Sequence, residues 1–235
     1  MRLEKYISDS VICSRKEASF LIKKAKVMVN GKTSLKPSLN VVPGKDKIFL
    51  DGKPIIYKEF IYIMMNKPGG VISATDDKSQ KTVLSLLPEN YQNKNLFPAG
   101  RLDKDTVGLL IITNDGKTAH SLLSPKNKVE KEYAVACDKE FTDEDVKVCL
   151  SGIRLSNGQS FMPAKLIIDE SDRKKARIII TEGKFHEIKN MCAYLSKKVV
   201  FLERKRFGNI LLDPSLERGN WRHLTDKEVH SLCEI

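Results

Sequence analysis

The apolar residues of this chain come in short runs that end at turn-forming residues, and this pattern limits the folds that the chain can adopt. Asn30-Gly31, Asp51-Gly52 and Asn114-Asp115-Gly116 each follow an apolar run of strand length. Asn-Gly and Asp-Gly favour the positive φ angles of tight hairpin turns. No apolar run approaches the roughly 20 residues that a membrane-spanning helix needs. The pattern therefore predicts many short strands joined by hairpins.

Charge is distributed unevenly along the sequence. The 235 residues carry 41 Lys and Arg against 30 Asp and Glu, a net charge of +11. Residues 1–58 hold 13 basic and 5 acidic side chains, whereas residues 59–235 are nearly balanced. A basic excess of this kind favours a polyanionic partner. We therefore predict a basic binding domain over residues 1–58, ending in a linker at 53–59, and a larger domain over residues 59–235.

Helical signals occupy the start of the first domain. Apolar residues 3–11 have helical spacing, Ser14 and Glu17 fit a capping box, and apolar residues 18–25 place one face of a second helix toward a core. Basic side chains on these helices are either a solvated face or contacts to RNA phosphates. Because the whole domain is basic, we favour RNA contact for six of them, namely Arg2, Lys5, Arg15, Lys16, Lys23 and Lys26.

The second domain alternates strand-like and helix-like segments. Strands are predicted at residues 60–65, 109–113, 133–137, 164–168, 177–181, 199–203 and 210–212, and helices at 117–123, 142–150 and 186–195. Thr142 and Asp145 fit the capping box of the middle helix. Strands that outnumber helices and follow one another by short connections favour an α+β fold on a mostly antiparallel mixed sheet.

Motifs of cofactor and metal chemistry are missing from the sequence. It has no glycine-rich nucleotide-binding loop, no nucleophile elbow and no Cys/His cluster with zinc spacing. The five cysteines are scattered and odd in number, which we interpret as free thiols of a reducing cytoplasm. The N-terminus lacks the apolar segment of a secretory signal. We therefore expect a cytoplasmic protein with no membrane association, no cofactor and no metal.

One polar, glycine-bounded loop runs directly into the apolar strand at residues 109–113. It contains Gly100-Arg101-Leu102-Asp103. Loops held by a rigid strand are where catalytic side chains concentrate. From spacing alone, a structural role is favoured, in which Asp103 pairs with Arg101 or caps a turn.

This four-residue motif resembles the signature of pseudouridine synthases, and the resemblance extends along nearly the whole chain. Residues 1–45 resemble an S4 RNA-binding domain. Motifs at residues 65–70, 130–133 and 182–191 are similar to the remaining catalytic-domain motifs and occur in the expected order. Within this family, the segment at residues 73–77 resembles RsuA-type enzymes, which act on the 16S RNA of the small ribosomal subunit.

The resemblance implies a reaction and a set of roles. Enzymes of this family isomerise uridine in RNA: the bond from C1′ to N1 breaks, the base turns, and C5 joins C1′ without a cofactor. Asp103 would be the catalytic carboxylate, Tyr133 the ring on which the base stacks, and Lys189 the cation beside the carboxylate. Arg101 would hold a phosphate or fill the space that the flipped nucleotide leaves. The carboxylate can act as a nucleophile or remove a sugar proton, and the sequence leaves both routes open.

The implied partner is 16S ribosomal RNA in an assembling small subunit, bound by a monomer. Lys104, Glu187 and Asn190 depart from the usual family pattern close to the site. A large-subunit (23S) RNA enzyme of the same family is the near alternative, and a non-catalytic S4-type assembly factor is another. Hydrolysis of a glycosidic bond is disfavoured, because the one candidate for a second carboxylate, Asp105, would share a face with Asp103 only in an extended loop.

Overall fold

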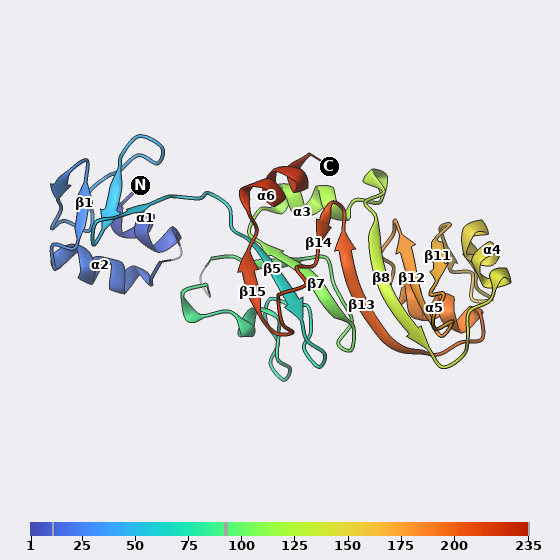
Figure 1. The fold of residues 1–235 in the computed structure, drawn as a ribbon. Coiled ribbons are helices and arrows are strands. Elements are labelled where there is room, and N and C mark those ends of the chain that lie inside the picture. The colour runs from blue at the N-terminus through green and yellow to red at the C-terminus, as the bar shows by residue number, and fades with distance from the viewer. Residues whose placement is uncertain (11, 92–93, 235) are drawn as a thin grey trace. The chain divides into compact units, whose positions relative to one another are not determined.

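The computed structural model describes residues 1–10, 12–91 and 94–234, and the chain divides into two compact units (Figure 1). The first unit comprises Met1–Ile61 and Leu87–Leu96, and the second comprises Tyr62–Leu86 and Phe97–Ile235. The ammonium group of Lys94 donates to the carbonyl and hydroxyl oxygens of Ser8 at 2.6 and 3.0 Å, which ties the inserted segment to the first unit. No helix of the described residues is long and apolar enough to span a bilayer.

The first unit packs two helices against a small antiparallel sheet. Its elements are α1 (Leu3–Asp9), α2 (Arg15–Lys23), β1 (Val27–Val29), β2 (Lys32–Thr33), β3 (Ile48–Leu50) and β4 (Lys53–Ile55), with strand order β2-β1-β3-β4. The predicted capping box of Ser14 and Glu17 is present at the start of α2. Asn30 and Gly31 have φ angles of 52° and 80°, which confirms the predicted tight hairpin between β1 and β2.

Two details of this unit correct the sequence prediction. Residues 53–55, predicted as part of a linker, form β4 instead, and Pro54 fits there because an edge strand leaves one side of its backbone unpaired. The second helix ends at Lys23, so Ala25 does not extend its apolar face but is exposed at a φ of 60°. Val11, predicted to continue the first helix, lies outside the described residues.

The second unit is built on a nine-stranded sheet. Its strands are β5 (Tyr62–Lys67), β6 (Phe97–Ala99), β7 (Val107–Thr113), β8 (Lys131–Cys137), β11 (Lys165–Ile168), β12 (Lys175–Ile180), β13 (Val199–Phe207), β14 (Ile210–Leu211) and β15 (Trp221–His223). The main order is β11-β12-β8-β13-β7-β5-β15. Among the described strands of this sheet, all pairs are antiparallel except β7 with β13. The predicted α+β fold on a mostly antiparallel mixed sheet is confirmed.

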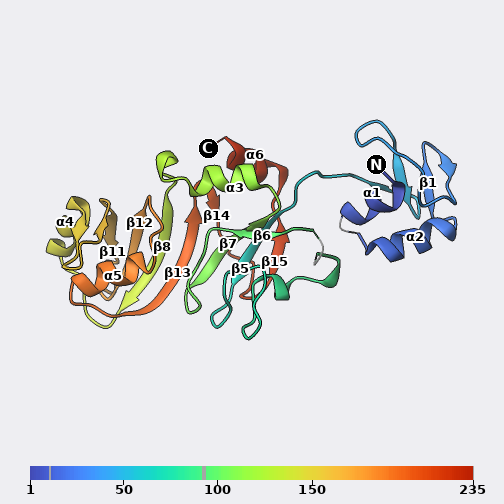
Figure 2. The same ribbon diagram turned by 180° about the vertical axis from the view of Figure 1, so that it is seen from behind.

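Four α-helices accompany this sheet, together with a separate hairpin of β9 (Ile153–Arg154) and β10 (Ser160–Phe161). The helices are α3 (Gly116–Leu123), α4 (Asp143–Ser151), α5 (Glu187–Tyr194) and α6 (Asp226–Cys233). Figures 1 and 2 both show α3 and α6 side by side, and Figure 2 shows α5 in front of the sheet near β8 and β12. The predicted capping box of Thr142 and Asp145 is present in α4.

The parallel pairing of β7 with β13 depends on a glycine. Gly108 has a φ of 97°, and a Cβ atom there would lie 2.4 Å from the carbonyl oxygen and 2.9 Å from the amide nitrogen of Arg204. Backbone atoms cannot move aside as a flexible side chain can, so only glycine permits this close approach. Gly108 therefore allows two groups of strands, β11-β12-β8-β13 and β7-β5-β15, to join into one sheet. It lies immediately after the loop that carries Asp103.

Candidate active site

A buried lysine holds the backbone of the loop before β7. Lys67, at the end of β5, is fully buried, and its ammonium group donates to the carbonyl oxygens of Asp103, Lys104 and Thr106 at 3.1, 3.3 and 2.8 Å. Burial lowers the pKa of Lys67 to about 8, and the negative charges of Asp105 and Asp103 oppose that shift. Lys67 thus fixes the loop through its carbonyl oxygens and leaves the Asp103 side chain free to face the pocket.

A second contact fixes the loop from its other side. The hydroxyl of Ser73 accepts from the amide of Leu102 at 3.0 Å and donates to the carbonyl oxygen of the same residue at 3.0 Å. Both residues are buried. Gly100, with a φ of 84°, provides the turn that enters the loop. The backbone next to Asp103 is therefore held at both neighbours before any substrate is present, as preorganisation of a catalytic group requires.

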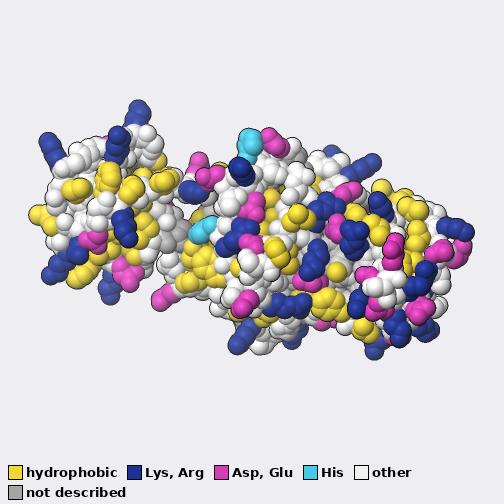
Figure 3. Space-filling view, in the orientation of Figure 1, with side chains coloured by type: hydrophobic (Ala, Val, Ile, Leu, Met, Phe, Trp, Pro, Cys, Tyr) yellow, Lys and Arg dark blue, Asp and Glu magenta, His cyan; other side chains and the backbone are white. Residues whose placement is uncertain are grey.

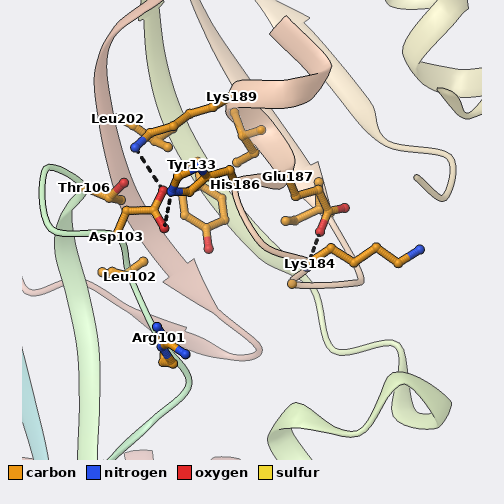
Figure 4. Close-up of a pocket in the computed structure, with 13 residues that line it drawn as sticks. Arg101, Leu102, Asp103, Thr106, Tyr133, Lys184, His186, Glu187, Lys189 and Leu202 are labelled. Atoms are coloured by element: carbon orange, nitrogen blue, oxygen red, sulfur yellow. Dashed lines mark hydrogen bonds and ion pairs between the residues drawn. The ribbon is translucent and has the colours of Figure 1, made fainter. Parts of the chain in front are cut away.

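The Asp103 carboxylate lies beside a cation from α5. The Nζ atom of Lys189 is 3.0 Å from an Asp103 oxygen (Figure 4). The same atom is 2.6 Å from an Asp105 oxygen. Burial would lower the pKa of Lys189, but its hydrogen bonds with Asp105 and Asp103 outweigh that effect and raise the pKa. The side chain is therefore a permanent cation at neutral pH. His186, which precedes α5, places its Nε2 atom 3.6 Å from Asp103.

Tyr133 of β8 lines the same pocket and is buried. Burial raises the pKa of its phenol, and interaction with the guanidinium of Arg204 opposes the rise. Arg204 of β13 is 1% exposed, donates from Nε to the carbonyl oxygen of Leu109 at 2.7 Å, and lies 4.8 Å from the ring of Phe207. Tyr133 is thus a neutral aromatic ring whose phenol interacts with a buried arginine.

The pocket between these residues is small but opens into a larger space. It measures about 60 Å³, and the neighbouring groove measures about 710 Å³. Both are lined by Asp103, His186 and Arg101, and Arg101 also lines a third cavity of about 490 Å³. Figure 4 shows the Arg101 side chain below the Asp103 carboxylate, at the side of the pocket away from Lys189. Arg101 therefore stands where these three spaces meet.

The structure brings Asp103, Tyr133, Lys189 and Arg101 together in the second unit. The six predicted RNA-binding residues, Arg2, Lys5, Arg15, Lys16, Lys23 and Lys26, all belong to the first unit and are exposed. On the face in Figure 3, basic side chains of that unit project outward with few acidic neighbours. Arg15 pairs with Glu4 at 2.9 Å and Lys26 with Asp51 at 3.2 Å.

Sequence reasoning missed Asp105, His186 and Arg204 as parts of this site. The sequence suggests Asp105 only as a second acid for hydrolysis, whereas in the structure it shares the ammonium group of Lys189 with Asp103. His186 follows the exposed Phe185 inside the motif at residues 182–191, and that position was the available signal. Nothing in the spacing of Arg204 distinguishes it from the other basic residues of its strand. Among the residues that the structure describes, no cluster of His, Cys, Asp and Glu is arranged to hold a metal ion.

Comparison with known proteins agrees with the fold. The family model for RNA pseudouridylate synthase matches residues 61–194, and the S4 domain model matches residues 1–47. The chain therefore belongs to the RNA pseudouridylate synthase family and carries an S4 domain. This confirms the resemblance that the four sequence motifs suggested.

Individual relatives match over almost their full length. An uncharacterized RNA pseudouridine synthase of Bacillus subtilis, YtzG, is 43% identical over 236 residues, which cover 100% of this chain and 99% of YtzG. The ribosomal small subunit pseudouridine synthase A of Vibrio parahaemolyticus is 38% identical and covers 99% of both chains. A pseudouridylate synthase crystal structure matches with a TM-score of 0.70 and 34% identity over 99% of both chains.

Proposed function

We propose that this protein converts a uridine of 16S ribosomal RNA to pseudouridine and that Asp103 is its catalytic carboxylate. Membership of the family and the small-subunit relatives support the reaction and the RNA class. The observation that carries the proposal is the contact of Lys189 with Asp103 in the pocket that Tyr133 also lines. A cation, a carboxylate and an aromatic ring at one site suit a base that must be held while its bond to the sugar is broken.

The reaction is an isomerisation, and its atoms balance within the nucleotide. The C1′–N1 bond breaks, the base turns, a C5–C1′ bond forms, the proton leaves C5, and N1 gains a proton. Asp103 acts either by adding to the substrate or by removing a sugar proton, and Lys189 places a positive charge 3.0 Å from its carboxylate. Flipping the uridine out of its stack costs a few kcal/mol. Stacking on Tyr133 offsets part of that cost, since base–aromatic stacking is worth about 1–3 kcal/mol.

In this proposal, each of the two predicted domains has its own function. Residues 1–58 dock the RNA through phosphate contacts of the six basic side chains named above, and residues 59–235 carry out the isomerisation. Arg101, at the mouth of the pocket, holds a backbone phosphate or fills the place that the uridine vacates. Because each chain contains its own complete site, a monomer suffices. A substrate in the assembling small subunit places the enzyme in the cytoplasm.

The test of this function is pseudouridine mapping. Purified protein is incubated with 16S RNA, with 23S RNA and with partly assembled small subunits, and each RNA is then mapped for pseudouridine. We expect one modified uridine in 16S RNA, with the same position unmodified in cells that lack the protein. Modification confined to 23S RNA would reassign the substrate, and RNA binding without any pseudouridine would overturn the enzymatic proposal.

A further inference from the structure

An aromatic pair stands exposed beside the pocket. Phe185 is 72% exposed and stacks on His186, with 3.8 Å between ring centroids and 20° between ring planes. Burial of apolar surface does not explain a phenylalanine that is mostly in water. His186 adopts a φ of 53°, a left-handed conformation that is uncommon for residues other than glycine and that clusters at functional sites. The pair therefore calls for a functional explanation.

The groove next to the pocket is built around this pair. Phe185 and His186 both line the 710 Å³ space, whose volume is in the range of sites for small organic ligands. Three cations, Arg101, Lys104 and Lys184, line it together with Asp77 and Asp103. Asp103 is paired with Lys189 and Lys184 with Glu182, so Arg101 and Lys104 against Asp77 leave the groove with an excess of positive charge. An aromatic surface among cations matches the bases and phosphates of single-stranded nucleic acid.

We propose that Phe185, stacked on His186, is a platform for the base of a nucleotide next to the target uridine, and that the cationic groove holds that nucleotide's phosphate. This inference rests on the proposed function, because it assumes RNA in the pocket. Flipping the target uridine leaves its neighbour with one unstacked face. The side of the Phe185 ring that points away from His186 can stack on this exposed face of the neighbouring base. The two sites are close enough for this, because the groove and the catalytic pocket share Asp103 and His186 at their border.

The test is a double-mutant cycle between the protein and the RNA. Binding is measured for wild-type protein and for the Phe185→Ala variant, each with an intact RNA and with RNAs that lack the base on one side or the other of the target uridine. We expect Phe185→Ala to weaken binding of the intact RNA by about 5- to 150-fold, the range for losing one base–aromatic stack. With the RNA that lacks the stacked base, the substitution should have no further effect, and Phe185→Trp should retain wild-type affinity.

Two comparisons separate base stacking by Phe185 from a merely supporting role and from failure of the proposed function. Tyr194→Ala removes another exposed aromatic ring, 52% exposed at the end of α5, and should leave binding unchanged. An equal loss for Phe185→Ala on intact and base-lacking RNAs would mean that Phe185 only supports His186, and would overturn the proposal, as would no loss at all. Pseudouridine formation by the wild-type protein on the same intact RNA is scored separately. Its absence would refute the proposed function, whereas its presence with an unaffected Phe185→Ala variant would refute only this inference.

Discussion

The ammonium group of Lys189 lies 3.0 Å from the carboxylate of Asp103, although Lys189 is in the first turn of α5 and Asp103 lies in the loop before β7. The two belong to strand groups that meet where β7 pairs with β13. The loop carrying Asp103 is fixed by Lys67 and Ser73, so its position does not depend on the ion pair with Lys189 of α5. The site is therefore rigid on the carboxylate side, and the ion pair joins the two halves of the sheet across the pocket.

Asp103→Asn tests the identity of the catalytic group. The amide keeps the shape of the side chain but can neither add to the substrate nor accept a proton, so we expect pseudouridine formation to fall by more than about 10³-fold. RNA affinity should stay at the wild-type level, because the predicted docking residues lie in the other unit. Single-turnover assays measure the rate of pseudouridine formation, and filter retention measures RNA affinity. Asp143→Asn, on the exposed surface of α4, is the matched control. Wild-type activity in Asp103→Asn would refute the assignment.

Lys189→Met removes the cation that two carboxylates share. We expect the rate to fall by about 10²- to 10³-fold, the usual loss when one preorganised electrostatic partner is deleted. The pKa of Asp105 is lowered mainly by its hydrogen bond to Lys189, so it should rise toward the ordinary value in this variant. An NMR titration of the Asp105 carboxyl group measures that shift. An unchanged titration would show that the contact does not persist in solution.

The alkaline side of the pH–rate profile should report on Lys67. Its pKa is lowered to about 8, so the amine is charged below that pH and neutral above it, with one fewer N–H to donate to the loop. We expect kcat to decline as pH rises through about 8, and NMR of the Lys67 side chain to titrate with the same midpoint. Lys189 cannot cause this decline, because its pKa is raised.

Lys131 provides the control for that assignment. Burial lowers its pKa to about 8 as well, but its ammonium group donates to the carbonyl oxygen of Val129 at 2.9 Å, and among the described residues it makes no hydrogen bond to the carbonyl oxygens that Lys67 holds. Lys131→Gln should therefore keep the alkaline decline. Loss of the decline in Lys131→Gln, with the Lys67 titration unchanged, would assign it to Lys131 instead.

Neutralising exposed lysines of the first unit should flatten the salt dependence of RNA binding. Lys16 and Lys23 lie on α2 and are exposed, and no ion pair of either one occurs among the described residues. In the Lys16→Gln/Lys23→Gln variant, the slope of log affinity against log salt should drop by about 0.7–0.9 for each lost phosphate contact. The matched Lys139→Gln/Lys174→Gln variant changes the same charge in the second unit. A slope that changes equally in both variants, or in neither, would contradict RNA docking by α2.

Gly108→Ala should prevent the close pairing of β7 with β13. The new Cβ atom would meet backbone atoms of Arg204 at 2.4 and 2.9 Å, and we expect the free energy of unfolding to fall by roughly 3 kcal/mol or more. Gly158→Ala introduces alanine at a similar φ of 87° with nothing within 4 Å, so it isolates the backbone strain. Urea unfolding of both variants measures the difference. Equal losses would show that the contact with Arg204 is relieved by a small shift of the strands.

Local signals in the sequence predicted local structure well. The hairpin at Asn30-Gly31 and the capping boxes at Ser14 and Thr142 follow from a few neighbouring residues, because backbone φ preferences and side-chain caps act over one turn. The same rules overlooked β4, whose Lys-Pro start is atypical of a strand and is stabilised by its place at a sheet edge. The C-terminal helix α6 was not predicted, although Thr225 and Glu228 form a capping box of the same kind.

The site was harder to predict because its geometry depends on distant pairings. The contact of Lys189 with Asp103 came from the family resemblance, and no periodicity in the sequence indicates it. The second contact of Lys189, with Asp105, and the interaction of the buried Arg204 with Tyr133 depend on how β8, β13 and α5 pack. Helical or strand spacing describes one element at a time, so it cannot show which side chains two elements place together.

The parallel pairing of β7 with β13 also sets when the two sides of the pocket can come together during synthesis. Translation delivers the loop with Asp103 first, and α5 with its lysine follows after β8, α4, β11 and β12. The sheet cannot close around Gly108 until Arg204 has left the ribosome. A chain that stops short of α5 therefore holds the Asp103 carboxylate without the cation that accompanies it in the folded site.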